Sequence, residues 1–187
     1  RDAIMIDGDG YDIDDVEEFN LLTRPTVQQI RRQVMMRRSV FNFTDDEVTE
    51  KELGYIVEAA KYAPTENNKQ GNAILVVRSD EGREEFKNII NDIKAPVFIF
   101  VFSDSEKEGA VCAHTMMQMV DAQPGLGASY IDSCPEKFDD DLKNRLHIPT
   151  DKKCVMAFCL GHTEQEFFSS VPRDRKRTRL NSSNDQI

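Results

Sequence analysis

The stretch RRSVFNFTDDEVTEKELGYIVEAAKYAPTENNKQ, residues 37–70, contains the strongest local signals in the chain. Thr49 and Glu52 have the spacing of a capping box, in which each side chain accepts a hydrogen bond from the other residue's backbone N–H at the start of a helix. Apolar residues then recur with helical spacing, namely Leu53, Ile56, Val57 and Ala60. The stretch therefore predicts an amphipathic helix between two polar segments, 37–39 and 63–70.

The rest of the chain alternates between helical and strand patterns. Apolar runs rich in β-branched and aromatic residues predict four buried strands, at 73–78, 95–102, 128–131 and 153–160. Besides the capping-box helix, capping residues and periodicity predict a helix from Pro25 to about Arg38, one capped by Ser79 or Asp80, one at about 106–122 and one starting at Pro135. This order of elements predicts an α+β fold.

Helical periodicity and residue type indicate which side chains form the apolar faces of the predicted helices. Helical spacing gives the first helix an apolar stripe of Val27, Ile30, Val34 and Met35, and gives the last helix Phe138, Leu142 and Leu146. Met116, Met117 and Met119 fit core positions better than a ligand surface, because methionine fills irregular gaps between packed elements. His114 lies in the same helix and is expected to be a satisfied core histidine.

Charge is unevenly distributed along the 187 residues. The chain has 24 Lys and Arg against 34 Asp and Glu, a net charge of −10, which argues against general binding to nucleic acid or to anionic membranes. Two basic segments, 24–38 and 171–180, nevertheless carry five Lys or Arg residues each. An acidic chain with two basic segments indicates a local anionic ligand.

The composition also indicates the cellular compartment of the protein and whether it binds a metal ion. No apolar run approaches the roughly 18 residues of a membrane-spanning helix, and the sequence has no signal-peptide pattern, so a cytoplasmic protein is expected. The four cysteines form no C-x-x-C pair, and the three histidines are far apart, so the sequence predicts free thiols and no metal site.

Three polar or glycine-rich segments are candidates for ligand binding, and each also has a purely structural interpretation. Arg37, Arg38 and Ser39 can hold a phosphate, or the arginines can interact with a helix C-terminus. Asn68 and Gln70 can bind hydroxyls or a heterocycle edge, or can belong to a simple turn. The segment 125–127, Gly-Leu-Gly, permits close backbone approach to a flat ligand, or ends a helix. No hydrolytic constellation is found, so any chemistry is expected to belong to a cofactor, and no catalytic side chain is predicted.

These segments occur in an order that resembles the nitroreductase family of flavoproteins. The 37–70 stretch resembles that family's R-R-S-x-R-x-F box, capped helix and A-P-S-x-x-N-x-Q-P loop. Three further matches follow in order, GLGASYID at 125–132, LHIPTDKKCVMAFCLGH at 146–162 and VPRDRK at 171–176, so the resemblance covers about residues 27–177. Phe41 stands where the family pattern has a second basic residue, and Gly71-Asn72 replaces its Pro-Trp.

The resemblance implies an FMN-binding α+β fold with a mostly antiparallel central sheet flanked by helices, assembled as an intertwined homodimer with its flavin sites at the interface. It places the FMN domain at 24–178, between an acidic extension at 1–23 and a polar tail at 179–187. The implied phosphate and ribityl contacts are Arg37, Arg38, Ser39 and Arg173. Asn68 and Gln70 would contact the ribityl chain or ring edge, Pro64 and Thr65 would line the partner's flavin, and the backbone of Gly125, Leu126 and Gly127 would approach the ring.

The implied activity is transfer of electrons from NAD(P)H or an iron–sulfur donor, through FMN, to a nitroaromatic or quinone-like acceptor. Alternatives are a dehalogenase-like or flavin-fragmenting relative, a flavin-binding redox sensor without turnover, and a module that binds a phosphoprotein. The first residues, RDAIMIDGDGYDI, resemble the segment after the last Cys-Pro of a bacterial ferredoxin module. This similarity predicts that the parent gene encodes a ferredoxin–nitroreductase fusion.

Overall fold

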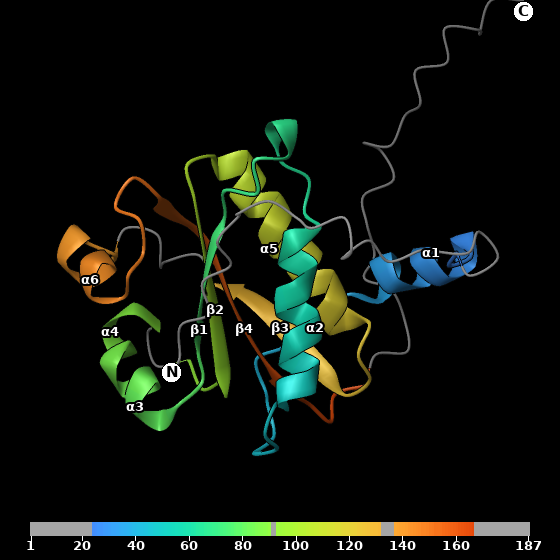
Figure 1. Ribbon diagram of the computed structural model, residues 1–187. Coiled ribbons are helices and arrows are strands. Elements are labelled where there is room, and N and C mark those ends of the chain that lie inside the picture. Colours follow the sequence, from blue (N-terminus) through green and yellow to red (C-terminus); the bar gives the residue numbers. More distant parts are fainter. Residues whose placement is uncertain (1–23, 91–92, 132–136, 167–187) are drawn as a thin grey trace, which may run out of the picture.

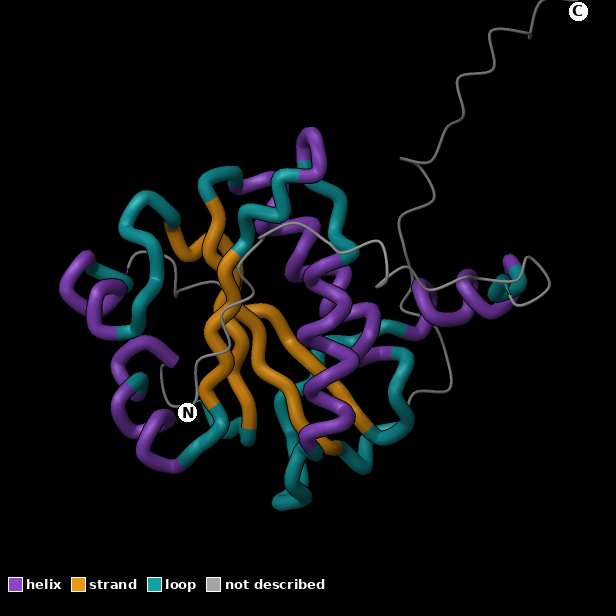
Figure 2. The backbone as a smooth tube through the Cα atoms, viewed as in Figure 1, coloured by secondary structure: helices purple, strands orange, loops and turns teal. Residues whose placement is uncertain are grey.

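The computed structural model describes residues 24–90, 93–131 and 137–166 of the chain. Its centre is a four-stranded antiparallel sheet in the order β1-β2-β4-β3 (Figure 2). The strands are β1 (Ala73–Val77), β2 (Val97–Ser103), β3 (Leu126–Ile131) and β4 (Lys153–His162). Each overlaps its predicted stretch with ends that differ by at most two residues, and the expected antiparallel α+β architecture is confirmed.

Helices cover both faces of the sheet (Figure 1). On one face lie α2 (Glu50–Lys61) and α5 (Glu106–Asp121), and on the other lie α3 (Asp80–Glu85), α4 (Lys87–Ile90) and α6 (Asp140–Arg145). A short helix η3 (Glu66–Asn68) follows α2, and α1 (Val27–Met36) projects from the side of the body. The sheet is therefore the middle of three layers.

β2 joins the two layers of core because its side chains alternate between the faces of the sheet. Val97, Ile99 and Val101 pack with α2 and α5, whereas the phenylalanines of the strand pack on the other face. There Phe138 meets Phe100 and Phe102 edge-on, with ring centroids 5.1 and 5.0 Å apart. All seven residues of β2 are buried, as its apolar pattern predicts.

The predicted capping box is confirmed at the start of α2. The Thr49 N–H donates to Glu52 Oε2 at 2.8 Å, and the Glu52 N–H donates to Thr49 Oγ1 at 3.2 Å. The predicted apolar stripe of this helix faces the core, where all four residues are buried: Leu53, Ile56, Val57 and Ala60. The helix is thus fixed both at its N-terminus and along its inner face.

The first and the last helix each have a feature that the sequence pattern leaves open. The apolar stripe of α1 does not reach the core: Val27 is 80% exposed and Val34 is 62% exposed, because α1 lies outside the three layers. Among the described residues, the last helix starts at Asp140, where Asp139 caps it, so Phe138 precedes the helix; Pro135 lies outside the described residues.

Two side chains of α5 also lie elsewhere than expected. Met119 and His114 are exposed, because the inner face of α5 is occupied by other residues. Met116 and Met117 are fully buried in the layer between α5 and the sheet, as predicted for core methionines. The helix capped by Ser79 is confirmed, but it is divided into α3 and α4.

A close approach at the outer edge of β3 fixes the segment that follows α1. Ser39 pairs with Ala128 in a parallel bridge, and the Val40 N–H donates to the Ala128 carbonyl at 3.0 Å. A Cβ at Gly127 would lie 2.7 Å from Val40 Cγ2, closer than real contacts allow. Glycine at position 127 is therefore required by the packing of Val40.

We expect Gly127→Ala to lower the free energy of unfolding by about 1–3 kcal/mol, the usual effect of overpacking a filled site. Gly54→Ala is the matched control, because outside the backbone of α2 no atom of the described residues lies within 4 Å of its Cβ position. There alanine should stabilise the helix by up to about 1 kcal/mol. Urea unfolding of both variants measures the difference.

A second variant separates the Val40 contact from a general effect of the added methyl group. Val40→Ala removes two of the three atoms that the new Cβ would meet. The double variant should therefore lose less stability than the sum of the single variants. Strict additivity would show that the Val40 contact is not the reason for glycine at position 127.

Candidate functional site

The polar segment after α1 and the glycine segment after α5 meet at the edge of β3. The bridge between Ser39 and Ala128 places Arg37 and Arg38 beside the segment 125–127. Arg37 is half-buried and Ser39 is exposed. Two of the predicted binding segments, 86 residues apart in the chain, therefore lie side by side in the fold.

Arg37 lies within a cluster of titratable groups. Burial raises the pKa of the Asp121 carboxyl, at the end of α5, from 3.8 to about 6, although the positive charge of Arg37 lowers it. Burial also raises the pKa of Tyr130, which the Arg37 charge lowers and the Asp121 charge raises. Tyr130 Oη lies 3.4 Å from His114 Nδ1. The segment that follows α1, together with α5 and β3, thus supplies these four polar groups.

Arg38 binds carbonyl groups at the C-terminal end of α1, which is the structural role that the sequence allowed for it. Its Nη1 donates to the carbonyl of Arg37 at 2.9 Å and to those of Met35 and Met36, both at 3.3 Å. These contacts satisfy the last carbonyls of α1, which lack partners within the helix. Arg37 and Arg38 therefore have different surroundings, although they are neighbours in the sequence.

The glycine segment forms a turn whose conformation requires glycine. Gly125 has φ +81°, in the left-handed region, and its carbonyl accepts from the Thr163 N–H at 2.8 Å. Leu126 and Gly127 then enter β3 and are buried. Of the two glycines, only Gly125 has its outer side exposed, since Val40 covers Gly127.

A contact between a histidine and a carboxylate lies next to this turn. His162 Nε2 lies 3.4 Å from Glu52 Oε2, and a Cβ at Gly125 would lie 3.6 Å from His162 Nδ1. Burial on its own would raise the pKa of Glu52, but hydrogen bonds from Thr49 and the charge of His162 outweigh it and lower the pKa. The capping box of α2 is thereby connected to the glycine turn.

The loop 64–70 has an unusual backbone. Asn67, Asn68 and Gln70 have φ of 54°, 55° and 49°, left-handed values that non-glycine residues rarely adopt. Internal bonds hold them: the Gln70 N–H donates to Thr65 Oγ1 at 3.0 Å, and Gln70 Nε2 donates to Asn68 Oδ1 at 3.2 Å. Pro64 and Asn68 are exposed. Such conformations concentrate where a loop has to present polar groups in a fixed arrangement.

Within a single chain, the loop 64–70 lies far from Arg37. The Glu66 N–H donates to Glu108 Oε1 at 2.8 Å, at the first turn of α5, whereas Asp121 at the last turn interacts with Arg37. With a rise of about 1.5 Å per residue, the two positions on α5 are about 20 Å apart. Figure 1 shows η3 and α1 in separate parts of the molecule.

The remaining predicted site residue, Arg173, lies outside the described residues. Sequence reasoning missed Asp121 and Tyr130. A signal for Asp121 was present, since an acidic residue at a helix C-terminus opposes the helix dipole and therefore calls for a specific explanation. Tyr130 carried no such signal, because an aromatic residue in a strand is ordinary.

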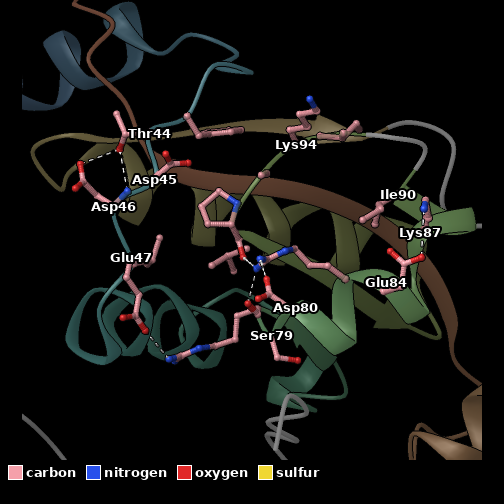
Figure 3. Close-up of a pocket in the computed structure, with 18 residues that line it drawn as sticks. Thr44, Asp45, Asp46, Glu47, Ser79, Asp80, Glu84, Lys87, Ile90 and Lys94 are labelled. Carbon is pink, nitrogen blue, oxygen red and sulfur yellow. Dashed lines mark hydrogen bonds and ion pairs between the residues drawn. The ribbon is translucent and has the colours of Figure 1, made fainter.

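A cavity of about 1050 Å³ opens elsewhere, between the segment 43–48, the segment 93–97 and the helices α3 and α4. Figure 3 shows Asp46 and Glu47 across the cavity from Lys87. Its arginines are held by ion pairs: Arg78 contacts Glu47 and Glu50, and Arg83 contacts Asp80. The residues that line this cavity include none of the predicted binding residues.

Within the described ranges, no group of three or more His, Cys, Asp or Glu residues is placed to hold a metal ion. The cysteines Cys112, Cys154 and Cys159 are buried, and burial raises the pKa of the Cys112 thiol to about 12. Cys134 lies outside the described residues. In that same described part, no helix combines the length and the apolar character needed to cross a bilayer.

The sheet order and the flanking helices define the nitroreductase fold. A nitroreductase with bound FMN from Bacteroides fragilis matches with a TM-score of 0.67 and 17% identity over 81% of this chain and 98% of that one. An FMN-dependent nitroreductase from Clostridium difficile R20291 matches with a TM-score of 0.64 and 21% identity, covering 80% and 97%. A nitroreductase family protein from Clostridium difficile 630 gives 0.63 and 20%, covering 81% and 93%.

The sequence comparison agrees with the fold. Residues 34–96 match the model of the nitroreductase family, a range that contains the whole 37–70 stretch, with α2, and also β1. The predicted resemblance to this family is confirmed. No curated protein matches the sequence.

We expect the Asp121 carboxyl to make stability depend on pH. Because its pKa is higher in the folded chain, about 6, than its ordinary value of 3.8, the folded state holds the proton more tightly. Stability should therefore fall as the pH rises from about 4 to about 6. Asp121→Asn should be more stable than the wild type at pH 8 by about 1 kcal/mol, since solvent screens a half-buried group, and equal to it near pH 4.

Urea unfolding at pH 4 and pH 8 measures this difference. Glu58→Gln, at an exposed carboxylate of α2, is the control for removing one negative charge from an acidic chain. If both variants change stability by the same amount at each pH, the effect belongs to net charge and not to burial of Asp121.

Proposed function

We propose that this chain is an FMN-dependent oxidoreductase that passes electrons from NAD(P)H or an iron–sulfur donor to nitroaromatic or quinone-like acceptors. The nitroreductase fold, shared with structures that contain FMN, supports this class of activity. The observation that carries the proposal is the meeting of Arg37, Ser39 and Gly125 at one edge of β3. A guanidinium, a hydroxyl and an uncovered glycine are each suited to a flat ligand that carries a phosphate. They come from two segments that are far apart in the sequence.

The residues at this edge fit the parts of FMN. The half-buried guanidinium of Arg37 and the exposed hydroxyl of Ser39 are donors suited to a phosphate. Among the described residues, one atom, His162 Nδ1, lies within 4 Å of a Cβ position at Gly125, which leaves room for a flat ring to approach the backbone there. Arg173, which the family resemblance adds, would supply a second guanidinium. These residues and Arg173 all lie within the proposed domain 24–178.

FMN, when bound, would supply the transfer of electrons between donor and acceptor. The chain would bind the phosphate through Arg37 and Ser39 and orient the ring against the turn at Gly125. The ion pair of His162 with Glu52 would hold that turn in place. No side chain of the chain is proposed as a proton donor to the acceptor.

We further propose that two copies of the chain form each site. The loop 64–70 of one copy is about 20 Å from Arg37 along α5, so it would reach the cofactor held by a second copy. The exposed apolar face of α1 supports this assembly, because Val27, Ile30 and Val34 are all uncovered in the single chain. Pro64 and Thr65 would then line the partner's flavin, together with Asn68 and Gln70.

We expect the purified protein to bind FMN and to show the flavin absorption band near about 450 nm. Arg37→Ala should weaken FMN binding by about 1–3 kcal/mol, because it removes a charge-assisted contact. Arg32→Ala is the matched control, since it removes the same charge from the exposed face of α1. A fluorescence titration with FMN measures both affinities, and equal weakening would contradict the assignment of Arg37 to the phosphate. A wild type that takes up no FMN would contradict the proposed function.

Mixing two defective variants tests whether the site is shared. Arg37→Ala and a loop variant, Thr65→Ala with Gln70→Ala, should each bind FMN weakly as homodimers. When the two are unfolded together and refolded, half of the dimers should be mixed, and each mixed dimer should contain one site with both native parts. About a quarter of all sites should then regain native affinity for FMN, as equilibrium titration measures. No recovery would mean that each chain builds its site alone.

A further inference from the structure

A second cavity, of about 640 Å³, lies where the first turn of α5, the start of β4 and the helix α6 meet. It is lined by Glu106 and Ala110 of α5, by Phe138 and Lys143, and by residues 153–156 of β4. Of the described residues that line it, three are charged and the others are apolar. None of them is a predicted FMN residue, so this cavity is separate from the proposed flavin site.

Lys143, in α6, is a buried cation whose charge is poorly compensated within the described residues. It is 7% exposed, and its Nζ donates to Asp140 Oδ1 at 3.3 Å and to the Thr150 carbonyl at 3.4 Å. Both contacts are longer than the about 2.7–2.9 Å of a strong charge-assisted hydrogen bond. The Asp140 side chain is 73% exposed, so solvent screens its charge. The third N–H of the ammonium has no acceptor in the described part of the chain.

A buried ammonium with these surroundings calls for a further partner. Removing a cation from water is unfavourable unless a counterion and hydrogen-bond acceptors replace the solvent. The cavity that Lys143 lines has the volume of a small-molecule pocket, since such pockets measure about 300–1,000 Å³. An anionic group bound there would supply both the missing acceptor and the missing negative charge.

The charges around the cavity favour a ligand with one negative charge. Lys143 and Lys153 are two cations and Glu106 is one anion, which leaves one positive charge without a counterpart on the lining side chains. Glu106 and Ala110 lie at the start of α5, where the positive end of the helix dipole also attracts an anion. A carboxylate carries one charge at neutral pH, whereas a phosphate monoester carries nearly two. The second charge would meet Glu106 and a chain whose net charge is −10.

A β-bulge shapes the wall of the cavity that β4 forms. Phe102 of β2 pairs with Cys154 and Val101 pairs with Met156, so Val155 has no partner in β2. Val155 and Met156 are half-buried, whereas residues 157–161 of the same strand are buried. Bulges bend a strand and recur beside binding sites. The wall opposite the charged groups of a ligand is therefore apolar and irregular.

We propose that this cavity binds a small carboxylic acid with an apolar body, in its ionised form. The carboxylate accepts a hydrogen bond from the Lys143 ammonium, and the body packs against Phe138, Val155 and Met156. Lys153 is exposed and adds to the attraction of the anion. Binding makes or breaks no covalent bond and transfers no electron. The inference goes beyond the proposed function and does not depend on the binding of FMN.

Calorimetric titration of the wild-type chain at pH 7 tests the ligand class. The probes are benzoate and hexanoate, which each carry one negative charge, and benzamide, which has nearly the shape of benzoate but no charge. We expect saturable binding of at least one carboxylate with a dissociation constant of about 1 mM or lower, and binding of benzamide at least about tenfold weaker. Binding of neither carboxylate up to about 20 mM, or equal binding of benzamide and benzoate, would overturn the proposal.

The variant Lys143→Met locates the bound carboxylate. Methionine keeps an unbranched apolar side chain at the buried position and removes the charge. The affinity for the carboxylate should fall about tenfold or more, because a charge-assisted contact is lost, whereas the affinity for benzamide should not fall. Lys107→Met is the matched control, since it removes the same charge from an exposed position of α5 that does not line the cavity. Equal affinity of wild type and Lys143→Met for the carboxylate contradicts the assignment.

A second variant, Glu106→Gln, tests the balance of charge and decides the proposal where Lys143→Met does not fold. Removing the one acidic side chain among the described lining residues should strengthen binding of the carboxylate about threefold or more, because the anion no longer meets a like charge. Glu58→Gln removes an exposed carboxylate of α2 and should leave the affinity unchanged. If Glu106→Gln binds the carboxylate no more tightly than Glu58→Gln does, the anion is not held in this cavity and the proposal fails.

Discussion

The contact between Val40 and Gly127 determines where the rest of the site lies. A side chain at position 127 would collide with Val40, so only glycine lets the segment after α1 pair with the outer edge of β3. This pairing places Arg37 beside the glycine turn and against the end of α5. Glycine in the Gly-Leu-Gly segment thus has two separate roles, a close packing of backbones at Gly127 and a left-handed turn at Gly125.

The fold distinguishes the basic residues of the segment 24–38 by their surroundings. The acidic character of the chain, with a net charge of −10, keeps non-specific anions away. Of the five arginines of residues 24–38, Arg31 and Arg32 lie on α1, which projects from the body, and the other three flank that helix. Within that group the arginines differ in their surroundings. Arg38 is bonded to the carbonyls of α1, and Arg37 faces Asp121, so sequence clustering alone does not make them equivalent.

Much of the fold could be predicted from the sequence because its signals are local. The capping box of Thr49 and Glu52 and the alternation in β2 each depend on residues within one turn or one strand. The exposed stripe of α1 could not be predicted, because periodicity reports that a face is apolar and not what covers it. The cluster of Arg37 with Asp121 and Tyr130 was beyond sequence reasoning as well, since three separate elements have to be packed before these charges affect one another.

The length of the helix α5 matters for more than its packing against the sheet. Its first turn holds the loop 64–70 through Glu108, and its last turn meets Arg37 through Asp121. The length of the helix therefore sets the separation and the relative rotation of these two contacts. One inserted residue would turn these ends by about 100° relative to each other and separate them by about 1.5 Å. A change of length that leaves both ends of α5 in their present arrangement would therefore have to fall in the connections on either side of the helix.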